Sequence, residues 1–173
     1  MITKISLGED LELRPYTKDQ DVSFALLWYR DEEDLEMIDG KDHGGPYSLE
    51  QLQRMYEYLS DRGEVYIIYK KGKDWIPIGD VTFSQKDMPI VLAGTHRQQG
   101  IGRRVVKALL QEGKRKGWTW MAVREVYYFN AASKRLFESC GFVKDHPTAH
   151  GWSYIYHFDE GESRHVGGEG ILR

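Results

Sequence analysis

The sequence predicts a mixed α/β (α+β) fold, a largely antiparallel, twisted sheet of six to seven strands flanked by about four helices. Three observations predict this class. Short segments with the two-residue alternation of strands recur along the chain, and segments with helical apolar spacing interrupt them. Several strand segments follow one another with only short turns between them. The last two apolar segments, 142–144 and 152–158, have the pattern of a closing hairpin.

The N-terminal elements begin with a strand. Residues 11–15 alternate apolar and polar side chains and end at a proline, which predicts a strand. Thr17 and Gln20 have the spacing of a capping box, in which a hydroxyl accepts from a free backbone N–H and an amide reaches back to the cap. A helix is therefore expected after Thr17, ending at about Trp28.

An acidic segment separates the two N-terminal helices. Residues 31–45 are acidic and then rich in glycine, which predicts a loop. Ser48 and Gln51 repeat the capping-box spacing, so a second helix should begin there. Its apolar side chains fall on one helical face: Leu49, Leu52, Met55, Tyr56 and Leu59.

The rest of the chain mixes strands and helices. Strands are predicted at 64–69, 75–83 and 88–95, with a glycine-containing turn at 70–73. A helix at 100–116 follows, then a strand within 118–129.

A short helix and a tail complete the prediction. Asn130 is a plausible N-cap of a helix that ends at Gly141. We expect one domain, 1–158, followed by a polar tail, 159–173, that contains four glycines.

Composition excludes several classes of protein. A chain of 173 residues that is 40% apolar and 13% aromatic can bury a core without disulfides or a structural metal, and it is not expected to be disordered. The longest apolar run, 24–29, is far short of the roughly 20 residues that span a bilayer. The N-terminus lacks the pattern of a signal peptide. The single cysteine, Cys140, favours a reducing, cytoplasmic setting.

Charge is unevenly distributed along the chain. Residues 31–61 contain ten acidic and two basic side chains, whereas residues 97–135 contain ten basic and two acidic ones. Both runs can be solvated helix faces, but a basic half also suits a phosphate-rich ligand and an acidic half a cationic partner. The net charge of −3 argues against a nucleic-acid partner.

The most informative segment, 92–103, passes from a strand through a turn into a helix. Gly100 and Gly102 would let a ligand approach the backbone, and the first N–H groups of the helix lack internal partners. With the helix dipole, these groups form an anion site suited to a pyrophosphate, and Arg97, Arg103 and Arg104 add full charges. A ligand-free, glycine-softened turn is the simpler alternative. The segment matches neither the dinucleotide fingerprint nor the Walker loop.

A second motif, 130–142, makes a resemblance specific. The first segment matches Gln/Arg-x-x-Gly-x-Gly/Ala, and the second matches Asn-x-x-Ala/Ser-x-x-Leu-Tyr-x-x-x-Gly-Phe except at Phe137. In this order the two motifs resemble those of the GNAT superfamily of acetyl-CoA-dependent N-acetyltransferases. The resemblance extends loosely over 11–158 and is strong over 91–142.

The resemblance implies acetyl-CoA as cofactor and no metal. It places the pyrophosphate on the turn and the pantetheine arm along 90–92, where two strands splay apart. Asn130 would contact the pantetheine or phosphate side, although the residue could also be only an N-cap. The cofactor-binding residues that follow are Ile90, Leu92, Arg97, Gln98, Gln99, Gly100, Ile101, Gly102, Arg103, Asn130, Ser133 and Phe137.

Acetyl transfer to an amine needs a base, because an ammonium of the lysine type has a pKa of about 10.4. Glu125 is the first candidate, since a glutamate at this relative position is the proposed base of the similar bacterial ribosomal-protein alanine N-acetyltransferases. Glu125 could instead form a structural ion pair on an exposed strand. Asp80 and Asp87 are the alternatives.

Phe137 departs from the family pattern. Many relatives have a tyrosine there that is proposed to protonate the departing CoA thiolate, and phenylalanine has no proton to give. Because an ordinary thiol has a pKa of about 8.5, the thiolate can leave with little help, or with help from Tyr127, Tyr128 or water. Phe137 would then pack against the cofactor or the core. We expect direct transfer, with Cys140 as a core residue.

The acceptor is expected to be a small cationic amine, aminoglycoside-like or polyamine-like. The resemblance places the acceptor pocket at the first helices, their loop and the last strands, and the acids and aromatics there favour a cation. The residues concerned are Trp28, Asp31, Asp34, Asp39 and Trp152. Two alternatives remain open, a peptide or protein N-terminus as acceptor and a non-catalytic acetyl-CoA-binding module. No membrane partner is expected, and the chain would act alone or as a homodimer.

Overall fold

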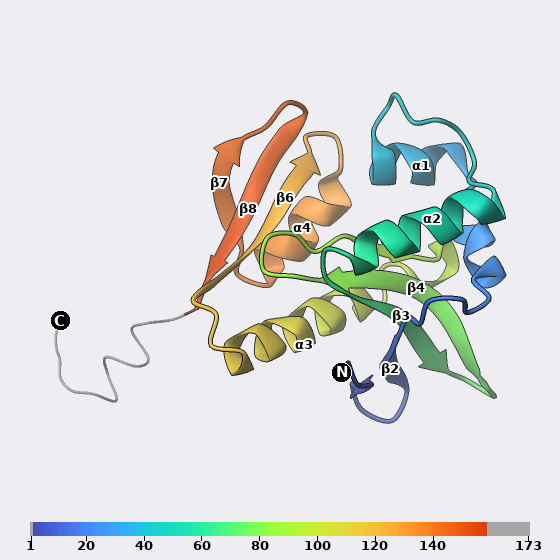
Figure 1. The fold of residues 1–173 in the computed structure, drawn as a ribbon. Coiled ribbons are helices and arrows are strands. Elements are labelled where there is room, and N and C mark those ends of the chain that lie inside the picture. The colour runs from blue at the N-terminus through green and yellow to red at the C-terminus, as the bar shows by residue number, and fades with distance from the viewer. Residues whose placement is uncertain (1, 159–173) are drawn as a thin grey trace, which may run out of the picture.

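The structure, a computed structural model, describes residues 2–158. Met1 and the predicted tail at 159–173 lie outside the described residues. Within the described residues, eight strands form two sheets, and every pair of neighbouring strands is antiparallel. The predicted mixed α/β fold is confirmed, with the difference that the strands divide into a larger and a smaller sheet (Figure 1).

The larger sheet follows the chain order of its strands. It contains β1 (Ile5–Ser6), β2 (Leu11–Pro15), β3 (Glu64–Lys71), β4 (Trp75–Phe83) and β5 (Ile90–Leu92). Strand β1 is too short to show an alternation in the sequence, and it was not predicted. As the last strand of this sheet, β5 has one free edge.

The smaller sheet has the order β6–β8–β7, with β6 at Trp120–Tyr127, β8 at Gly151–His157 and β7 at Val143–Pro147. The turn between β4 and β5 joins it to the larger sheet. Ala122 N–H donates to the Gln85 carbonyl at 2.8 Å, and Arg124 N–H donates to the Asp87 carboxylate at 2.9 Å. The sheets are thus held together at this turn without a strand ladder between β5 and β6.

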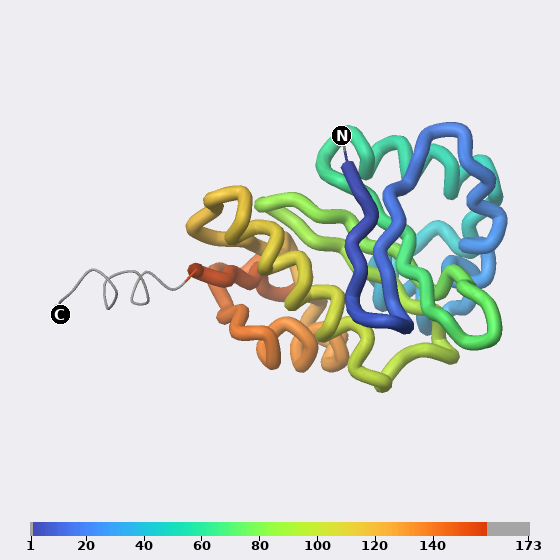
Figure 2. Tube along the Cα trace, turned by 90° about the horizontal axis from the view of Figure 1, so that it is seen from below, coloured from blue at the N-terminus to red at the C-terminus, as the bar shows by residue number. Residues whose placement is uncertain are grey.

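Helices cover the sheets from two sides. Helices α3 (Ile101–Arg115) and α4 (Ala131–Ser139) lie side by side on one face, as the view from below shows (Figure 2). They bury the larger core, which includes Val105, Leu109, Met121 and Phe142. On the other face lie a 3-10 helix, η1 (Ser23–Trp28), and helices α1 (Glu32–Asp39) and α2 (Leu49–Ser60), over a second core that contains Val65 and Ile67 of β3 (Figure 1).

The first predicted helix differs from the observed one. Gln20 Oε1 accepts from Thr17 N–H at 2.7 Å, but Asp19 has a φ of 75° and the chain turns instead of coiling. Helix η1 begins only at Ser23, and its N-cap, Val22, makes no side-chain cap bond. Val22, Ala25 and Trp28 are buried at intervals of three, which matches the three residues per turn of a 3-10 helix.

The loop predicted over 31–45 was wrong in part, because its first half is helix α1. The acidic residues of its first turn are favourable beside the positive end of the helix dipole. Leu35 is fully buried, and Ile38 packs on the same side of the helix. Acidity here marks the start of a helix and not a break in structure.

The predicted capping box of α2 is confirmed. Ser48 Oγ accepts from Gln51 N–H at 3.1 Å, and Gln51 Oε1 accepts from Ser48 N–H at 2.8 Å. Among the described residues, no helix has the length and apolar character needed to cross a bilayer.

Candidate functional site

The free edge of β5 offers backbone hydrogen-bonding groups to a ligand. Thr82 N–H donates to the Pro89 carbonyl at 3.0 Å, and Ala93 N–H donates to the Ile78 carbonyl at 2.7 Å. By the alternation of an antiparallel ladder, the backbone groups of Ile90 and Leu92 then point away from β4. Such an edge can pair with the amides of an extended ligand, so Ile90 and Leu92 fit a pantetheine arm.

The turn before α3 exposes a second set of donors. Gln98 and Gly100 have φ values of 61° and 77°, and Gly100 is the N-cap of α3 without a side-chain cap bond. A Cβ built on Gly100 would meet no atom within 4 Å, so the backbone faces open space. A left-handed turn followed by an uncapped helix N-terminus leaves backbone N–H groups without intrahelical partners, which is the arrangement that an anion site requires. Nearby, Gln99 Nε2 donates to the Thr95 carbonyl at 3.1 Å.

Gly102 has a packing role that the sequence motif did not indicate. A Cβ on Gly102 would lie 3.4 Å from Leu136 of α4 and 3.7 Å from Leu92 of β5. The missing side chain therefore lets α3 approach α4 and β5 closely. Ile101 beside it is 3% exposed and belongs to the core. These two residues can contribute backbone N–H groups to the turn, but their side-chain positions face inward.

The arginines near the turn have different partners. Arg103 is exposed on α3. Arg104 donates to both carboxylate oxygens of Asp10, at 2.9 and 3.2 Å, and to the Leu7 carbonyl. The expectation that Arg104 serves a phosphate ligand is not supported, because its guanidinium holds the turn between β1 and β2. Arg97 donates through Nε to the Leu92 carbonyl at 3.0 Å and through Nη1 to Asp34 at 2.7 Å.

The start of α4 joins the second motif to α1. Asn130 Oδ1 accepts from Ser133 N–H at 3.1 Å, so Asn130 is the N-cap, and its Nδ2 lies 3.5 Å from the Met37 carbonyl of α1. Phe137 is 3% exposed and packs edge-to-face on Phe142 at 5.3 Å. Of the two expected positions for Phe137, cofactor or core, the structure shows the core.

A β-bulge decides the orientation of Glu125. Met121 and Val123 of β6 point into the core, so strict alternation would send Glu125 there as well. The register shifts between Val123 and Val126, and Val126 takes the next core position. The extra residue leaves Glu125 on the outer side of the strand, where its Oε2 accepts from His150 N–H at 2.9 Å. The Thr148 hydroxyl, and then the His150 N–H, lower the pKa of Glu125, so it is ionised at neutral pH.

Tyr127, at the end of β6, lies against the end of α1 and is influenced by two carboxylates, Glu125 and Asp39. Burial, and then the charges of Glu125 and Asp39, raise the pKa of Tyr127. Tyr47 donates from its hydroxyl to Asp39 Oδ2 at 2.7 Å. The C-cap of α1, Gly40, packs on the Tyr127 ring, because a Cβ there would lie 3.4 Å from the phenol.

Asp80 is a buried carboxylate with two phenol partners. It is 3% exposed on β4, and its Oδ2 accepts from Tyr29 Oη at 2.7 Å and Tyr56 Oη at 2.8 Å. Burial raises the pKa of Asp80 to about 6, and the two phenol bonds oppose this rise. Asp80 therefore titrates nearer to neutral pH than an ordinary aspartate, but it has little access to a ligand.

The remaining predicted acceptor residues are dispersed. Trp28 is 4% exposed in the second core and packs on Phe24. Asp31 is the exposed N-cap residue of α1 and makes no side-chain cap bond. Trp152 lies below the Lys144 ammonium, 5.1 Å from it, and alternates along β8 with Ser153, which faces the outer side. Of the acceptor residues predicted from the sequence, Asp39 is the one whose charge acts on Tyr127.

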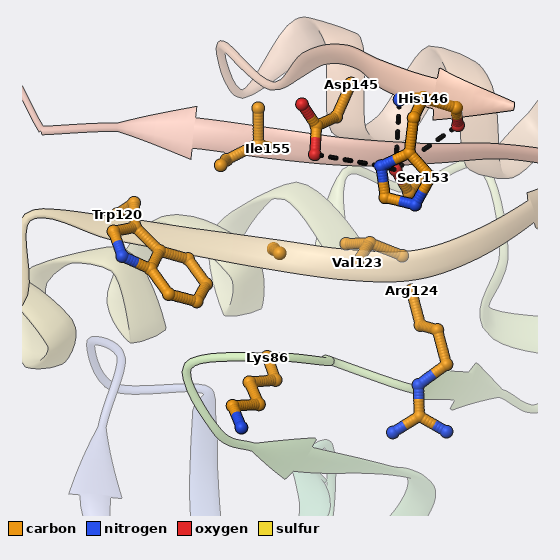
Figure 3. Close-up of a pocket in the computed structure, with 9 residues that line it drawn as sticks. Lys86, Trp120, Val123, Arg124, Asp145, His146, Ser153 and Ile155 are labelled. Carbon is orange, nitrogen blue, oxygen red and sulfur yellow. Dashed lines mark hydrogen bonds and ion pairs between the residues drawn. The ribbon is translucent and has the colours of Figure 1, made fainter.

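The outer face of the smaller sheet carries a shallow pocket of about 340 Å³. Figure 3 shows Trp120 and Ile155 on its apolar side; Lys86 lies on the β4–β5 turn, and Arg124 extends from β6 toward that turn. His146 contacts Ser153 Oγ at 2.9 Å on the opposite side. None of the residues predicted to bind cofactor or acceptor lines this pocket.

A histidine and two glutamates approach one another near α1. Potential ligand atoms of Glu32, Glu36 and His43 lie within 4.8 Å of one another. However, His43 Nδ1 accepts from Gly45 N–H at 3.0 Å, which leaves the ring proton on Nε2, 2.9 Å from Glu32. The group is thus a hydrogen-bonded corner of the loop after α1.

Sequence reasoning missed the tyrosines of this region. Tyr29 and Tyr56 reach Asp80 from 51 and 24 positions away, and Tyr47 reaches Asp39 from eight. Helix and strand periodicities relate residues only a few positions apart. The sequence pattern therefore could not indicate these tyrosine–aspartate contacts.

Comparisons with known proteins agree with this geometry. The family model of the acetyltransferase (GNAT) domain matches residues 10–143. A search of curated proteins found no match. Several solved structures are similar to this chain over most of its length. A domain from Methanocaldococcus jannaschii DSM 2661 is 20% identical, with a TM-score of 0.71 over 87% of this chain and 100% of that one.

Two acetyltransferases of stated substrate are similar in fold. The Salmonella typhimurium enzyme that modifies the N-terminal serine of ribosomal protein L7/L12 is 16% identical, with a TM-score of 0.68 over 90% of this chain and 99% of that one. AAC(6')-Ib in complex with ribostamycin and coenzyme A is 16% identical, with a TM-score of 0.71 over 94% and 100%. At these identities the likeness is one of fold. Together with the family match, it shows that this chain belongs to the GNAT family of acetyltransferase domains.

Proposed function

We propose that this chain transfers an acetyl group from acetyl-CoA to the primary amine of a small cationic acceptor. One observation carries the proposal. The bulge in β6 brings an ionised carboxylate, Glu125, to the outer side of the strand, and the charges of both Glu125 and Asp39 act on Tyr127. A base and an acidic group suited to a cation thus both act on Tyr127, and the helix that carries Asp39 is joined to the turn before α3 through Asp34 and Arg97.

The residues present fit acetyl-CoA. The outward backbone groups of Ile90 and the outward N–H of Leu92, whose carbonyl accepts from Arg97, would hold the pantetheine arm. The N–H groups of the turn from Gln98 to Arg103 would hold the pyrophosphate. Arg97 and Arg103 add positive charge. Bound acetyl-CoA would supply a thioester whose acetyl carbon a neutral amine nitrogen can attack.

Glu125 would act as the base. Its lowered pKa keeps it ionised at neutral pH, so it can accept a proton from the acceptor ammonium. The freed nitrogen lone pair then forms the new N–C bond as the C–S bond breaks and its electron pair leaves with sulfur. The nitrogen gives up its second proton, directly or through water, to the departing CoA thiolate, so that the products are the N-acetyl amide and free CoA thiol. Asp80 has a pKa nearer to neutral, but it is 3% exposed and bonded to two phenols, so an acceptor reaches it less readily.

The cluster beside Glu125 favours a cationic acceptor. Asp39 lies at the C-terminal end of α1, where the helix dipole is negative, and Tyr47 holds its carboxylate. A second ammonium of a polyamine-like or aminoglycoside-like molecule would be attracted there while the first faces Glu125. The raised pKa of Tyr127 keeps its hydroxyl protonated, so it can donate a hydrogen bond to the acceptor.

Direct transfer fits the state of Cys140. Cys140 is 8% exposed, and burial raises the pKa of its thiol. A buried, protonated thiol is a poor nucleophile, so an acetyl-cysteine intermediate is disfavoured. A reducing cytoplasm would keep this thiol free.

Free-thiol release from acetyl-CoA tests the proposal. The panel contains aminoglycosides, polyamines, amino acids and peptides with free N-termini. We expect release with aminoglycosides or polyamines. Release with peptides alone would show that the acceptor is a peptide N-terminus and not a small cationic amine. If the protein binds CoA but no amine causes release, a binding module without catalysis would be favoured.

Two variants identify the base. Glu125→Gln should lower kcat by about 10²- to 10⁴-fold, while the dissociation constant for CoA stays unchanged. Glu9→Gln, an exposed glutamate on the turn before β2, is the matched control. Because Glu125 is ionised from pH 5 to pH 8, kcat/KM should show no inflection near pH 6. An inflection there that disappears in Asp80→Asn would instead identify Asp80 as the base.

A further inference from the structure

Arg97 is held in one orientation by two partners from different elements. Its Nε donates to the Leu92 carbonyl on the open edge of β5, and its Nη1 donates to Asp34 of α1 at 2.7 Å. The Asp34 side chain is 14% exposed and that of Arg97 is 40% exposed. The ion pair is thus largely shielded on the aspartate side, whereas part of the guanidinium stays accessible.

The Arg97–Asp34 ion pair connects the turn before α3 to helix α1. Arg97 begins the turn that leads to α3, and Asp34 lies 63 positions earlier in the chain. Asn130, the N-cap of α4, also contacts α1, through the Met37 carbonyl. Helix α1 is therefore attached to both motifs that define the cofactor site.

We propose that Asp34 is a positioning residue that orients Arg97 for the phosphates of the cofactor. This inference rests on the proposed function, and it removes Asp34 from the expected acceptor residues. An arginine side chain on a surface turn has many rotamers, and ordering it on binding has a cost in conformational entropy. Asp34 removes this cost beforehand, because it fixes the guanidinium beside Leu92. The donors not engaged by Leu92 and Asp34 remain for the pyrophosphate.

The direction in which CoA affinity changes when Asp34 is removed distinguishes a positioning role from a purely electrostatic effect. A carboxylate near a pyrophosphate site repels the ligand, so its removal should tighten CoA binding if charge alone matters. If Asp34 orients Arg97, its removal should weaken CoA binding. The two explanations therefore predict opposite changes in the dissociation constant.

The experiment is calorimetric titration of CoA into the intact protein and its variants. We expect Asp34→Asn to raise the dissociation constant by about 2- to 10-fold. Glu33→Gln removes an exposed negative charge from the same helix turn, and it should leave the constant unchanged or slightly lower. Asp34→Glu, which keeps a carboxylate, should lie closer to the wild-type value than Asp34→Asn does. Circular dichroism checks that all variants fold.

A double-mutant cycle tests whether Asp34 acts through Arg97. In an Arg97→Ala background, Asp34→Asn should no longer change the dissociation constant. Tighter binding by Asp34→Asn, or an equal loss in both backgrounds, would overturn the inference. If the wild-type protein itself fails to bind CoA, the proposed function falls and this inference with it. If CoA binds but Asp34→Asn has no effect, only the inference falls.

Discussion

The hydroxyl of Tyr29 donates a 2.7 Å hydrogen bond to the buried carboxylate of Asp80, 51 residues away. Tyr56 donates a second bond to the same oxygen. Burial disfavours the ionised form and raises the pKa of Asp80 to about 6, while the two phenols stabilise the carboxylate. This group joins the C-cap of η1, helix α2 and strand β4.

Tyr29→Phe removes one of the two donors to Asp80. A buried carboxylate that loses a hydrogen bond costs about 1 to 3 kcal/mol, so the free energy of unfolding should fall by this amount at pH 7.5. At pH 4.5 the loss should be smaller, because Asp80 is then mostly protonated. Urea unfolding at the two pH values measures both losses. An equal loss at both would contradict the role given to the phenol, and Tyr58→Phe, at an exposed tyrosine, is the control.

Asp80→Asn should change how stability depends on pH. The pKa of Asp80 is raised in the folded protein, so its contribution to stability is complete below about pH 4 and is lost as the pH rises through about 6. A shift of about two units corresponds to roughly 3 kcal/mol. The difference in unfolding free energy between wild type and Asp80→Asn should therefore move in favour of the variant between pH 4 and pH 7. A difference that stays constant across this range would show that Asp80 does not titrate as described.

Phe137→Tyr restores the residue of the family pattern. Because Phe137 is 3% exposed and packs on Phe142, the new hydroxyl would enter the core without a partner. We expect a loss of about 1 to 3 kcal/mol in unfolding free energy and no gain in kcat. Thermal unfolding and thiol release measure these quantities. A rise in kcat of several-fold would show instead that this ring faces the leaving sulfur.

Gly40→Ala tests the contact between α1 and Tyr127. Gly40 has a φ of 91° and a ψ of 175°, a region that side chains rarely adopt, and a Cβ there would lie 3.4 Å from the Tyr127 ring. The strain should cost about 1 to 3 kcal/mol in stability. As Asp39 moves with the end of α1, the KM for the acceptor should rise while CoA affinity stays the same. Gly44→Ala is the control, because a Cβ there meets nothing within 4 Å.

Helix starts that are set by residues close together in the chain were predicted correctly from the sequence. The Ser48–Gln51 capping box starts α2 as expected, and Gly100 begins α3 in a left-handed conformation. Helix α1 was missed because the acidic residues that suggested a loop are stabilised by the helix dipole and by the burial of Leu35. The pattern after Thr17 predicted the wrong kind of helix, since burial of Val22, Ala25 and Trp28 selects a 3-10 turn.

The sequence by itself determined the glycine-containing turn before α3 and the family, because both depend on residues close together in the chain. Only the tertiary structure decided which side of β6 carries Glu125, since a bulge opposite β8 breaks the alternation that would bury it. Only the tertiary structure joined Arg97 to Asp34 and surrounded Asp80 with phenols, because these partners lie 24 to 63 positions apart. Burial and charge at this site arise from packing between distant segments, and no local pattern records that packing.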